Sequence, residues 1–285
     1  MHLDFLFDPF THYAFMRKAL AACAILSIGG TPLGLFLTLR RMALVGDAMS
    51  HAILPGVAAA FLVTGLAVWP MTLGGFAAGL AVALAAAFLS RFTQLKEDTS
   101  FTLSYLTSIA LGMVLVSLKG SGVDLLHLLF GNVLAIDNEA LRLITGVACL
   151  TLFALTAFYR SFVIECFDPD FLSAAKRGGF IRPVFFMLLV INLVAAFQAL
   201  GTLMALGLML LPAIAAGFWT QRIGRALPLS IGLALIASYA GLLTSYYTNI
   251  PAGPAVVLAA SAITLLSVLG GSHGSLRGYL FEKNA

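Results

Sequence analysis

The stretch Leu39–Gly56 reads LRRMALVGDAMSHAILPG and places an ionisable pair inside an otherwise apolar run. Asp47 and His51 are four residues apart, so on a helix they lie on one face, and Pro55 continues that face one turn further on. An Asp at membrane depth costs at least about 2.5 kcal/mol on insertion scales, so such groups usually face a bundle interior or an aqueous path. The pattern therefore indicates an ion or proton route.

Pro55 adds a second feature to the same face. It has no N–H to donate, so the carbonyl of His51 loses its helical partner, and a kink is expected there. A freed carbonyl is tolerated at membrane depth only where it meets protein, water or an ion. Carboxylate, imidazole and carbonyl oxygen together predict a ligand cluster. The structural alternative is a neutral His51 bonded to Asp47, a pair that holds two helices together.

The composition indicates an integral membrane protein. Of 285 residues, 61% are hydrophobic and only 10% are charged, with a mean hydropathy of +1.02, whereas soluble domains carry about 25% charged residues. Apolar runs near the roughly 20 residues that cross a bilayer imply helices. No lysine follows a glycine, so the Gly-x-x-x-x-Gly-Lys phosphate loop is absent from the sequence. We therefore expect no enzyme here, and nucleotide binding would belong to another chain.

The remaining composition excludes other classes. The net charge of +4 is attributed to cytoplasmic loops rather than to nucleic-acid binding. Cys23, Cys149 and Cys166 are scattered, so neither a disulfide framework nor a zinc finger is indicated.

The expected fold is all-α, a polytopic membrane helical bundle of about nine (eight to nine) spans that forms one domain over residues 1–285. Residues 1–18 are aromatic and acidic, which suits an interfacial segment. Within the first span, Gly30 and Gly34 have the spacing that lets helices approach closely. Merging the sixth and seventh spans would give eight. The expected spans cover about 19–39, 43–66, 70–89, 101–118, 139–158, 183–200, 202–219, 227–246 and 254–269.

Basic residues then predict the orientation. If about nine helices alternate, most basic residues fall on one side, which is the cytoplasm by the positive-inside rule. The N-terminus is then outside and the C-terminus is cytoplasmic. The residues on that side are Arg40, Arg41, Arg91, Lys96, Arg160, Lys176, Arg177, Arg182, Arg222, Arg225, Arg277 and Lys283.

Two connections carry further candidates. Residues 160–182 form the longest polar connection, and Asp170 near the start of its central part with glycines at its end predicts a short cytoplasmic helix. In the outer connection, His127 beside Asp124 is a candidate to receive a metal at the outer mouth. The alternative is that His127 lies on the solvent-exposed face of an amphipathic surface helix. Within the spans, Asn192 is expected to be an interhelical hydrogen-bond partner.

Several motifs resemble one family. The run from Arg40 to Gly56 closely resembles the signature of the membrane subunits of zinc-, manganese- and iron-importing ABC transporters. Weaker apolar patterns agree in the same order, and the resemblance covers nearly the whole chain. These weaker patterns are Leu129–Asn132, Phe167–Phe171, Ala199–Ala213 and Tyr246–Gly253.

The resemblance implies a permease in the bacterial plasma (inner) membrane, with no permanently bound cofactor. Its partners would be a pair of cytoplasmic ATPase subunits, an extracytoplasmic metal-binding protein and a second permease subunit, as a homodimer or heterodimer. Asp47 and His51 look like the family's metal-contacting pair in the transit pathway. The coupling segment that docks on the ATPase would use Asp168, Asp170, Phe171, Lys176 and Arg177.

The transported ion is expected to be zinc, manganese or iron. Imidazole nitrogen suits zinc and iron, whereas carboxylate oxygen also suits manganese. The alternative function is a self-sufficient secondary transporter that uses Asp47 and His51 as a proton relay. Inverted repeats with broken helices would favour that alternative, and the sequence contains no convincing internal repeat.

Overall fold

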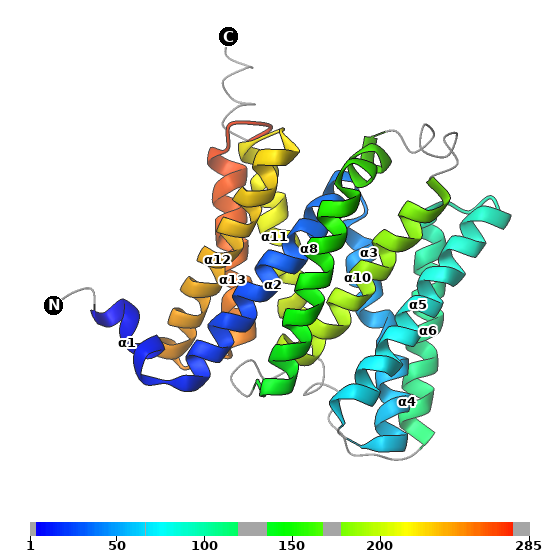
Figure 1. Ribbon diagram of the computed structural model, residues 1–285, viewed down its shortest axis with the longest axis horizontal. Helices are drawn as coiled ribbons and strands as arrows, with labels where there is room; N and C mark the ends of the chain where they lie inside the picture. The colour runs from blue at the N-terminus through cyan, green and yellow to red at the C-terminus, as the bar shows by residue number, and fades with distance from the viewer. Residues whose placement is uncertain (1–3, 66, 119–135, 168–177, 276–285) are drawn as a thin grey trace, which may run out of the picture.

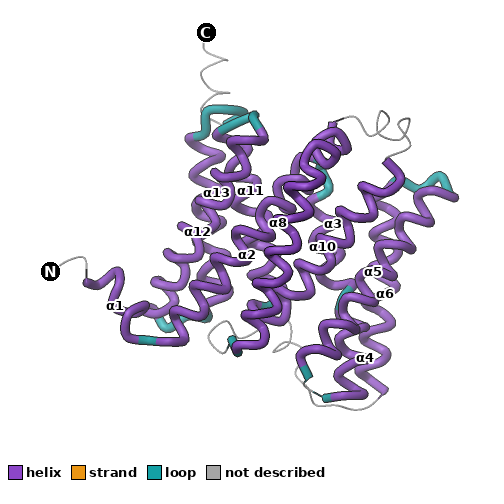
Figure 2. Tube along the Cα trace, in the orientation of Figure 1, coloured by secondary structure: helices purple, strands orange, loops and turns teal. Residues whose placement is uncertain are grey.

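The computed structural model describes residues 4–65, 67–118, 136–167 and 178–275. Within those ranges all regular structure is α-helical, which confirms the expected fold class (Figure 2). The helices are α1 (Asp4–His12), α2 (Ala14–Leu39), α3 (Ala43–Ala52), α4 (Leu54–Thr64), α5 (Val68–Phe92), α6 (Glu97–Leu118), α8 (Asn138–Phe167), α10 (Gly178–Leu200), α11 (Thr202–Trp219), α12 (Ile223–Thr248) and α13 (Ala252–Gly270).

Eight helical stretches in the described residues are long and apolar enough to cross a membrane, with α3 and α4 together forming one of them. The 22-residue helix α6 is not among the eight and corresponds to the fourth expected span. The sixth and seventh spans do not merge. Gly201 separates α10 from α11 with a φ of 85°, a left-handed conformation that glycine adopts without steric cost.

The long helices alternate in direction across the bundle. The C-terminal ends of α2, α5, α8, α11 and α13 lie at one end of the molecule, and α1 lies at the opposite end (Figure 1). This is the alternation on which the predicted loop assignment depends. The last three helices pack on one another, and α11 and α12 also pack on α2. Helices α4, α5 and α6 form a second group next to α10.

Some helix boundaries differ from the expected spans. Helix α8 continues to Phe167 rather than ending near residue 158. Residues 159–167 contain no glycine or proline, and Phe162 and Glu165 among them are buried. Helix α10 begins at Gly178, ahead of the expected start at residue 183. At the N-terminus, residues 14–18 already belong to α2, so only α1 forms a separate short helix in the expected interfacial segment.

Glycines set the closest approaches between helices. A Cβ atom on Gly34 would overlap the Met209 carbonyl oxygen, so α2 and α11 meet backbone to backbone. Gly56 and Gly74 make the same kind of contact between α4 and α5. The close approach predicted from the glycine spacing in the first span is thus confirmed at Gly34. Helix α3 contacts both α11 and α5, and α4 packs against α5.

Candidate functional site

The helix that carries the ionisable pair, α3, is separated from the next helix, α4, by a single residue, Ile53. Helix α3 stops at Ala52 and α4 starts at Leu54, with Pro55 in its first turn. The hydrogen-bond ladder restarts where the Val57 N–H donates to the Ile53 carbonyl at 3.2 Å. The break predicted from Pro55 is therefore confirmed.

The carbonyl groups at this break are satisfied by the protein. The Ile53 N–H donates to the His51 carbonyl, and the Ser108 hydroxyl of α6 donates to the Ala52 carbonyl at 3.1 Å. The His51 carbonyl thus keeps one local partner in place of the missing Pro55 N–H, and its role as a metal ligand stays a prediction. The other ligands that α3 offers are side chains.

Asp47 and His51 lie on one face of α3, as their spacing predicts. His51 Nε2 is 3.7 Å from Asp47 Oδ1. The His51 side chain is 36% exposed and the Asp47 side chain is 58% exposed. Ser50 lies between them and donates its hydroxyl to the Asp47 carbonyl at 2.8 Å. Because both members of the pair belong to one helix, their contact joins no second helix, which argues against the purely structural alternative.

The pair faces a pocket of about 590 Å³ between α3, α11 and α13. The walls are mostly apolar, so few groups compete with Asp47 and His51 for a cation. Three hydroxyl groups complete the polar lining, and those of Thr202 and Ser261 come from segments far along the chain, so no local pattern singled them out. The other lining residues are Ser50, Leu203, Leu206, Gly207, Leu210, Leu211, Ile214 and Val257.

One chain offers an incomplete set of metal ligands at this pocket. In the described part of the chain no three His, Cys, Asp or Glu side chains gather closely enough to hold a metal ion. Structural zinc sites use four protein ligands and catalytic sites use three. A carboxylate and an imidazole alone can hold a divalent ion loosely, or pass a proton, and they leave several coordination positions open.

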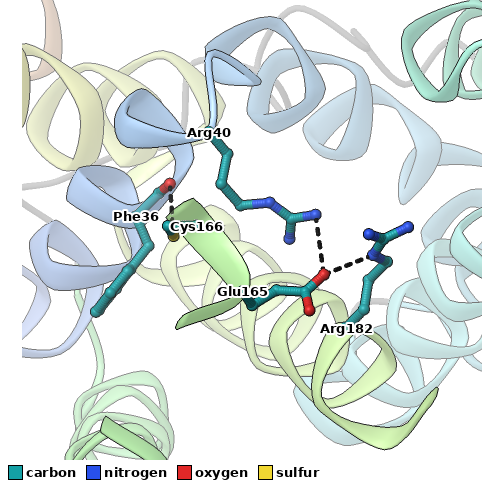
Figure 3. Close-up of polar contacts among 5 residues, drawn as sticks. All are labelled: Phe36, Arg40, Glu165, Cys166 and Arg182. Atoms are coloured by element: carbon teal, nitrogen blue, oxygen red, sulfur yellow. Dashed lines mark hydrogen bonds and ion pairs between the residues drawn. The ribbon is translucent and has the colours of Figure 1, made fainter. Parts of the chain in front are cut away.

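A second cluster of charges, missed by the sequence analysis, lies at the end of the bundle where α2, α8 and α11 terminate. Glu165 of α8 accepts a hydrogen bond from Arg182 Nε at 2.8 Å, and its Oε1 lies 3.6 Å from Arg40 Nη2 (Figure 3). The cluster borders a cavity of about 410 Å³, which is also lined by Arg41 and Lys96. Four basic residues assigned to one side of the membrane thus meet at one cavity. A lone carboxylate in the apolar run after Arg160 was the available signal for Glu165.

The other predicted site residues fall outside the described ranges. These are the outer-mouth candidate His127 with its neighbour Asp124, and the docking residues Asp168, Asp170, Phe171, Lys176 and Arg177.

Apolar spanning helices with a carboxylate–imidazole pair on an interrupted helix define a multi-pass membrane transport protein. The chain belongs to the ABC 3 transport family, whose model matches residues 12–271. The family resemblance noted in the sequence is thereby confirmed.

Relatives match over nearly the full chain. The manganese transport system membrane protein MntC of Halalkalibacterium halodurans is 33% identical over 268 residues, covering 93% of this chain and 90% of the relative. The chelated iron transport system membrane protein YfeD of Yersinia pestis is 30% identical, with 88% and 83% covered. The solved structure of PsaBC from Streptococcus pneumoniae in complex with Fab superposes with a TM-score of 0.83 at 30% identity, covering 98% of both chains.

Proposed function

We propose that this chain is the permease subunit of an ATP-binding cassette importer that moves a divalent transition metal ion into the cytoplasm. The observation that carries the proposal is the Asp47–His51 pair, which faces a mostly apolar pocket from an interrupted helix. The names of the relatives favour manganese or iron, and zinc also suits an imidazole and a carboxylate. The metal is the transported ion, and the proposal includes no permanently bound cofactor.

Three partners belong to this proposal. A pair of cytoplasmic ATPase subunits would supply the energy, since the sequence has no phosphate-binding loop. An extracytoplasmic metal-binding protein would deliver the ion, and a second copy of this chain would complete a homodimer. The bundle would lie in the bacterial plasma membrane with the N-terminus outside and the C-terminus in the cytoplasm.

The segment 168–177, which connects α8 to α10, is proposed to dock on the ATPase. Asp168, Asp170, Phe171, Lys176 and Arg177 are its contact candidates, and Phe171 is the largest apolar anchor among them. Cysteine pairs placed between Asp170 or Lys176 and the ATPase surface are expected to cross-link in the assembled complex. A complete absence of cross-links over 168–177 would move the docking site to the α5–α6 connection.

The transit role of the pair is tested by Asp47→Ala and His51→Ala in the complex reconstituted with its ATPase and binding protein. Uptake of manganese, iron or zinc should fall at least about tenfold, because losing even an outer-shell partner of a metal ligand costs 10–100-fold. The amount of permease in the membrane should stay at the wild-type level. Wild-type uptake rates in both variants would refute the transit role.

Asp8 and His12 provide a matched control. They have the same residue types and the same four-residue spacing, with His12 Nε2 3.1 Å from Asp8 Oδ1, but they lie exposed on α1. Asp8→Ala and His12→Ala should leave uptake unchanged. A secondary transporter, the alternative reading of the pair, would instead continue uptake without the ATPase subunits and respond to a proton gradient. The family of the chain disfavours that alternative.

A further inference from the structure

One buried carboxylate joins the ends of three helices. Glu165, near the end of α8, is 5% exposed. Its Oε1 accepts the Nε–H of Arg182 from α10 at 2.8 Å and lies 3.6 Å from Nη2 of Arg40, the residue that caps α2 (Figure 3). Two guanidinium groups thus share a single carboxylate oxygen.

The surroundings stiffen the link formed by Arg182, Glu165 and Arg40. The Arg40 side chain is 8% exposed, and its guanidinium lies 5.7 Å from the centre of the Phe185 ring and 5.8 Å from that of Phe186. Phe36 and Phe162 pack against Phe185 at 6.5 and 5.9 Å between ring centres. The Glu165 and Arg40 side chains are buried, so their attraction is stronger than at an exposed surface, whereas Arg182 is 39% exposed at the cavity. A displacement of Glu165 therefore pulls on Arg40 rather than being absorbed by solvent.

On one side, the link borders the proposed docking segment. Glu165 lies three residues before Asp168, and Arg182 lies five residues after Arg177, so the two bonded side chains flank 168–177. Any movement imposed on that segment must act through the ends of α8 and α10, where these side chains are anchored.

On the other side, the link reaches the helix that carries Asp47. Only Arg40, Arg41 and Met42 separate α2 from α3, and the turn is held by Met42 N–H donating to the Leu37 carbonyl at 2.9 Å. Arg41 has a φ of 57°, a conformation that side-chain-bearing residues rarely adopt and that stores strain at such a junction. Arg40 therefore connects rigidly to the first turn of α3.

We propose that Glu165 is a positioning residue that transmits movement of the 168–177 segment through Arg40 to α3, and so sets the placement of Asp47 and His51. This inference rests on the proposed function, because it takes 168–177 as the segment on which the ATPase acts. Glu165 itself touches neither metal nor nucleotide in this scheme. Its carboxylate bridges the two guanidinium groups and makes the three helix ends move together.

Coupling is measured as metal ions transported per ATP hydrolysed by the reconstituted complex. Glu165→Gln keeps the shape of the side chain but loses the charge that holds both arginines. We expect hydrolysis to continue while the coupling ratio falls at least about tenfold, the change that 1.4 kcal/mol produces. Glu139→Gln, an exposed substitution in the first turn of the same helix, should leave the ratio unchanged. A wild-type ratio in Glu165→Gln would overturn the inference.

A second measurement separates this inference from the docking proposal. Single spin labels are placed at Phe167, 68% exposed at the end of α8, and at Leu44, 82% exposed on α3, after the native cysteines are replaced by alanine. In the complex, both labels should change mobility when a non-hydrolysable nucleotide is added. In Glu165→Gln, the label at Phe167 should still respond and the label at Leu44 should not.

Each other outcome counts against a defined claim. A Phe167 label that stays silent in the otherwise wild-type complex would overturn the docking of 168–177, and the inference with it. An unchanged Leu44 response in Glu165→Gln would overturn the inference while docking stands, as would loss of both responses. If Glu165→Gln fails to accumulate in the membrane, Glu165→Asp is used, which keeps the charge on a shorter side chain. A lowered coupling ratio with hydrolysis retained would support the inference there, and an unchanged ratio would overturn it.

Discussion

Asn192 is a buried amide that ties α10 to α8. It is 4% exposed, and its Nδ2 donates to Thr151 Oγ1 at 2.6 Å and to the Leu188 carbonyl at 2.8 Å. The expected interhelical role of this residue is confirmed. Thr151 also donates to the Val147 carbonyl at 2.8 Å, so its hydroxyl keeps a partner when Asn192 is replaced.

We expect Asn192→Leu to destabilise the permease only modestly. Interhelical hydrogen bonds in membranes average about 0.6 kcal/mol in double-mutant cycles, with a maximum of about 1.7 kcal/mol. A cycle of Asn192→Leu and Thr151→Val, measured by reversible unfolding in bicelles, should give a coupling free energy in that range. Strictly additive effects of the two substitutions would show that the 2.6 Å contact contributes nothing to stability.

At the residue scale, the sequence predicts what is local. Asp47 and His51 could be paired from their spacing alone, because one helical turn determines which face they share. The partners of Glu165 could not, since Arg40 and Arg182 meet it only after three helices pack together. The hydroxyl groups of Thr202 and Ser261 join the pocket for the same reason.

At the scale of elements, a single glycine controls the fit of α2 against α11. Gly34→Ala would put its Cβ into the Met209 carbonyl, a backbone atom that cannot rotate away. We expect a loss of about 1–3 kcal/mol in the free energy of unfolding, the usual cost of overpacking. Thermal unfolding in detergent, with the fraction of folded protein followed by gel filtration, measures this loss.

Gly232→Ala in α12 is the matched control. A Cβ on Gly232 meets nothing within 4 Å, and Ala in a helix interior is favoured over Gly by about 0.5–1 kcal/mol. Gly232→Ala should therefore leave stability unchanged or raise it. Equal destabilisation by both alanines would mean that helix flexibility, rather than the contact with Met209, decides the effect at Gly34.

Helix interruptions are easier to predict than helix ends in this protein. Pro55 marks the break between α3 and α4 through its missing N–H, a property of one residue. Helix α8 ends at Phe167, nine residues beyond the expected end near residue 158, because the charge of Arg160 does not end the helix. The helix continues past Arg160, since Phe162 is buried and the buried Glu165 is paired with Arg40 and Arg182.

For the whole molecule, the proposed transit pair Asp47 and His51 gives the strongest reason for a second copy. Asp47 is 58% exposed in the single chain and lies in Ala43–Thr64, a stretch long and apolar enough to cross a membrane, where lipid would be a costly neighbour for a carboxylate. Among the described residues, each chain brings one carboxylate and one imidazole to the pocket. Two copies that face each other across α3 would cover Asp47 and double the ligand set to two carboxylates and two imidazoles.

The proposed homodimer predicts a metal stoichiometry. Because a closed transition-metal site takes about four protein ligands, we expect one Zn²⁺ or Mn²⁺ for about every two chains in calorimetric titrations of the purified complex. His51→Ala should abolish this metal binding. The mass measured by light scattering should still correspond to two copies of the permease. A single-chain site is incomplete and should bind far more weakly, so a dilution that dissociates the complex should release the ion. Tight binding of one ion per chain at monomeric mass would contradict the shared site and require ligands from outside the described residues, such as His127.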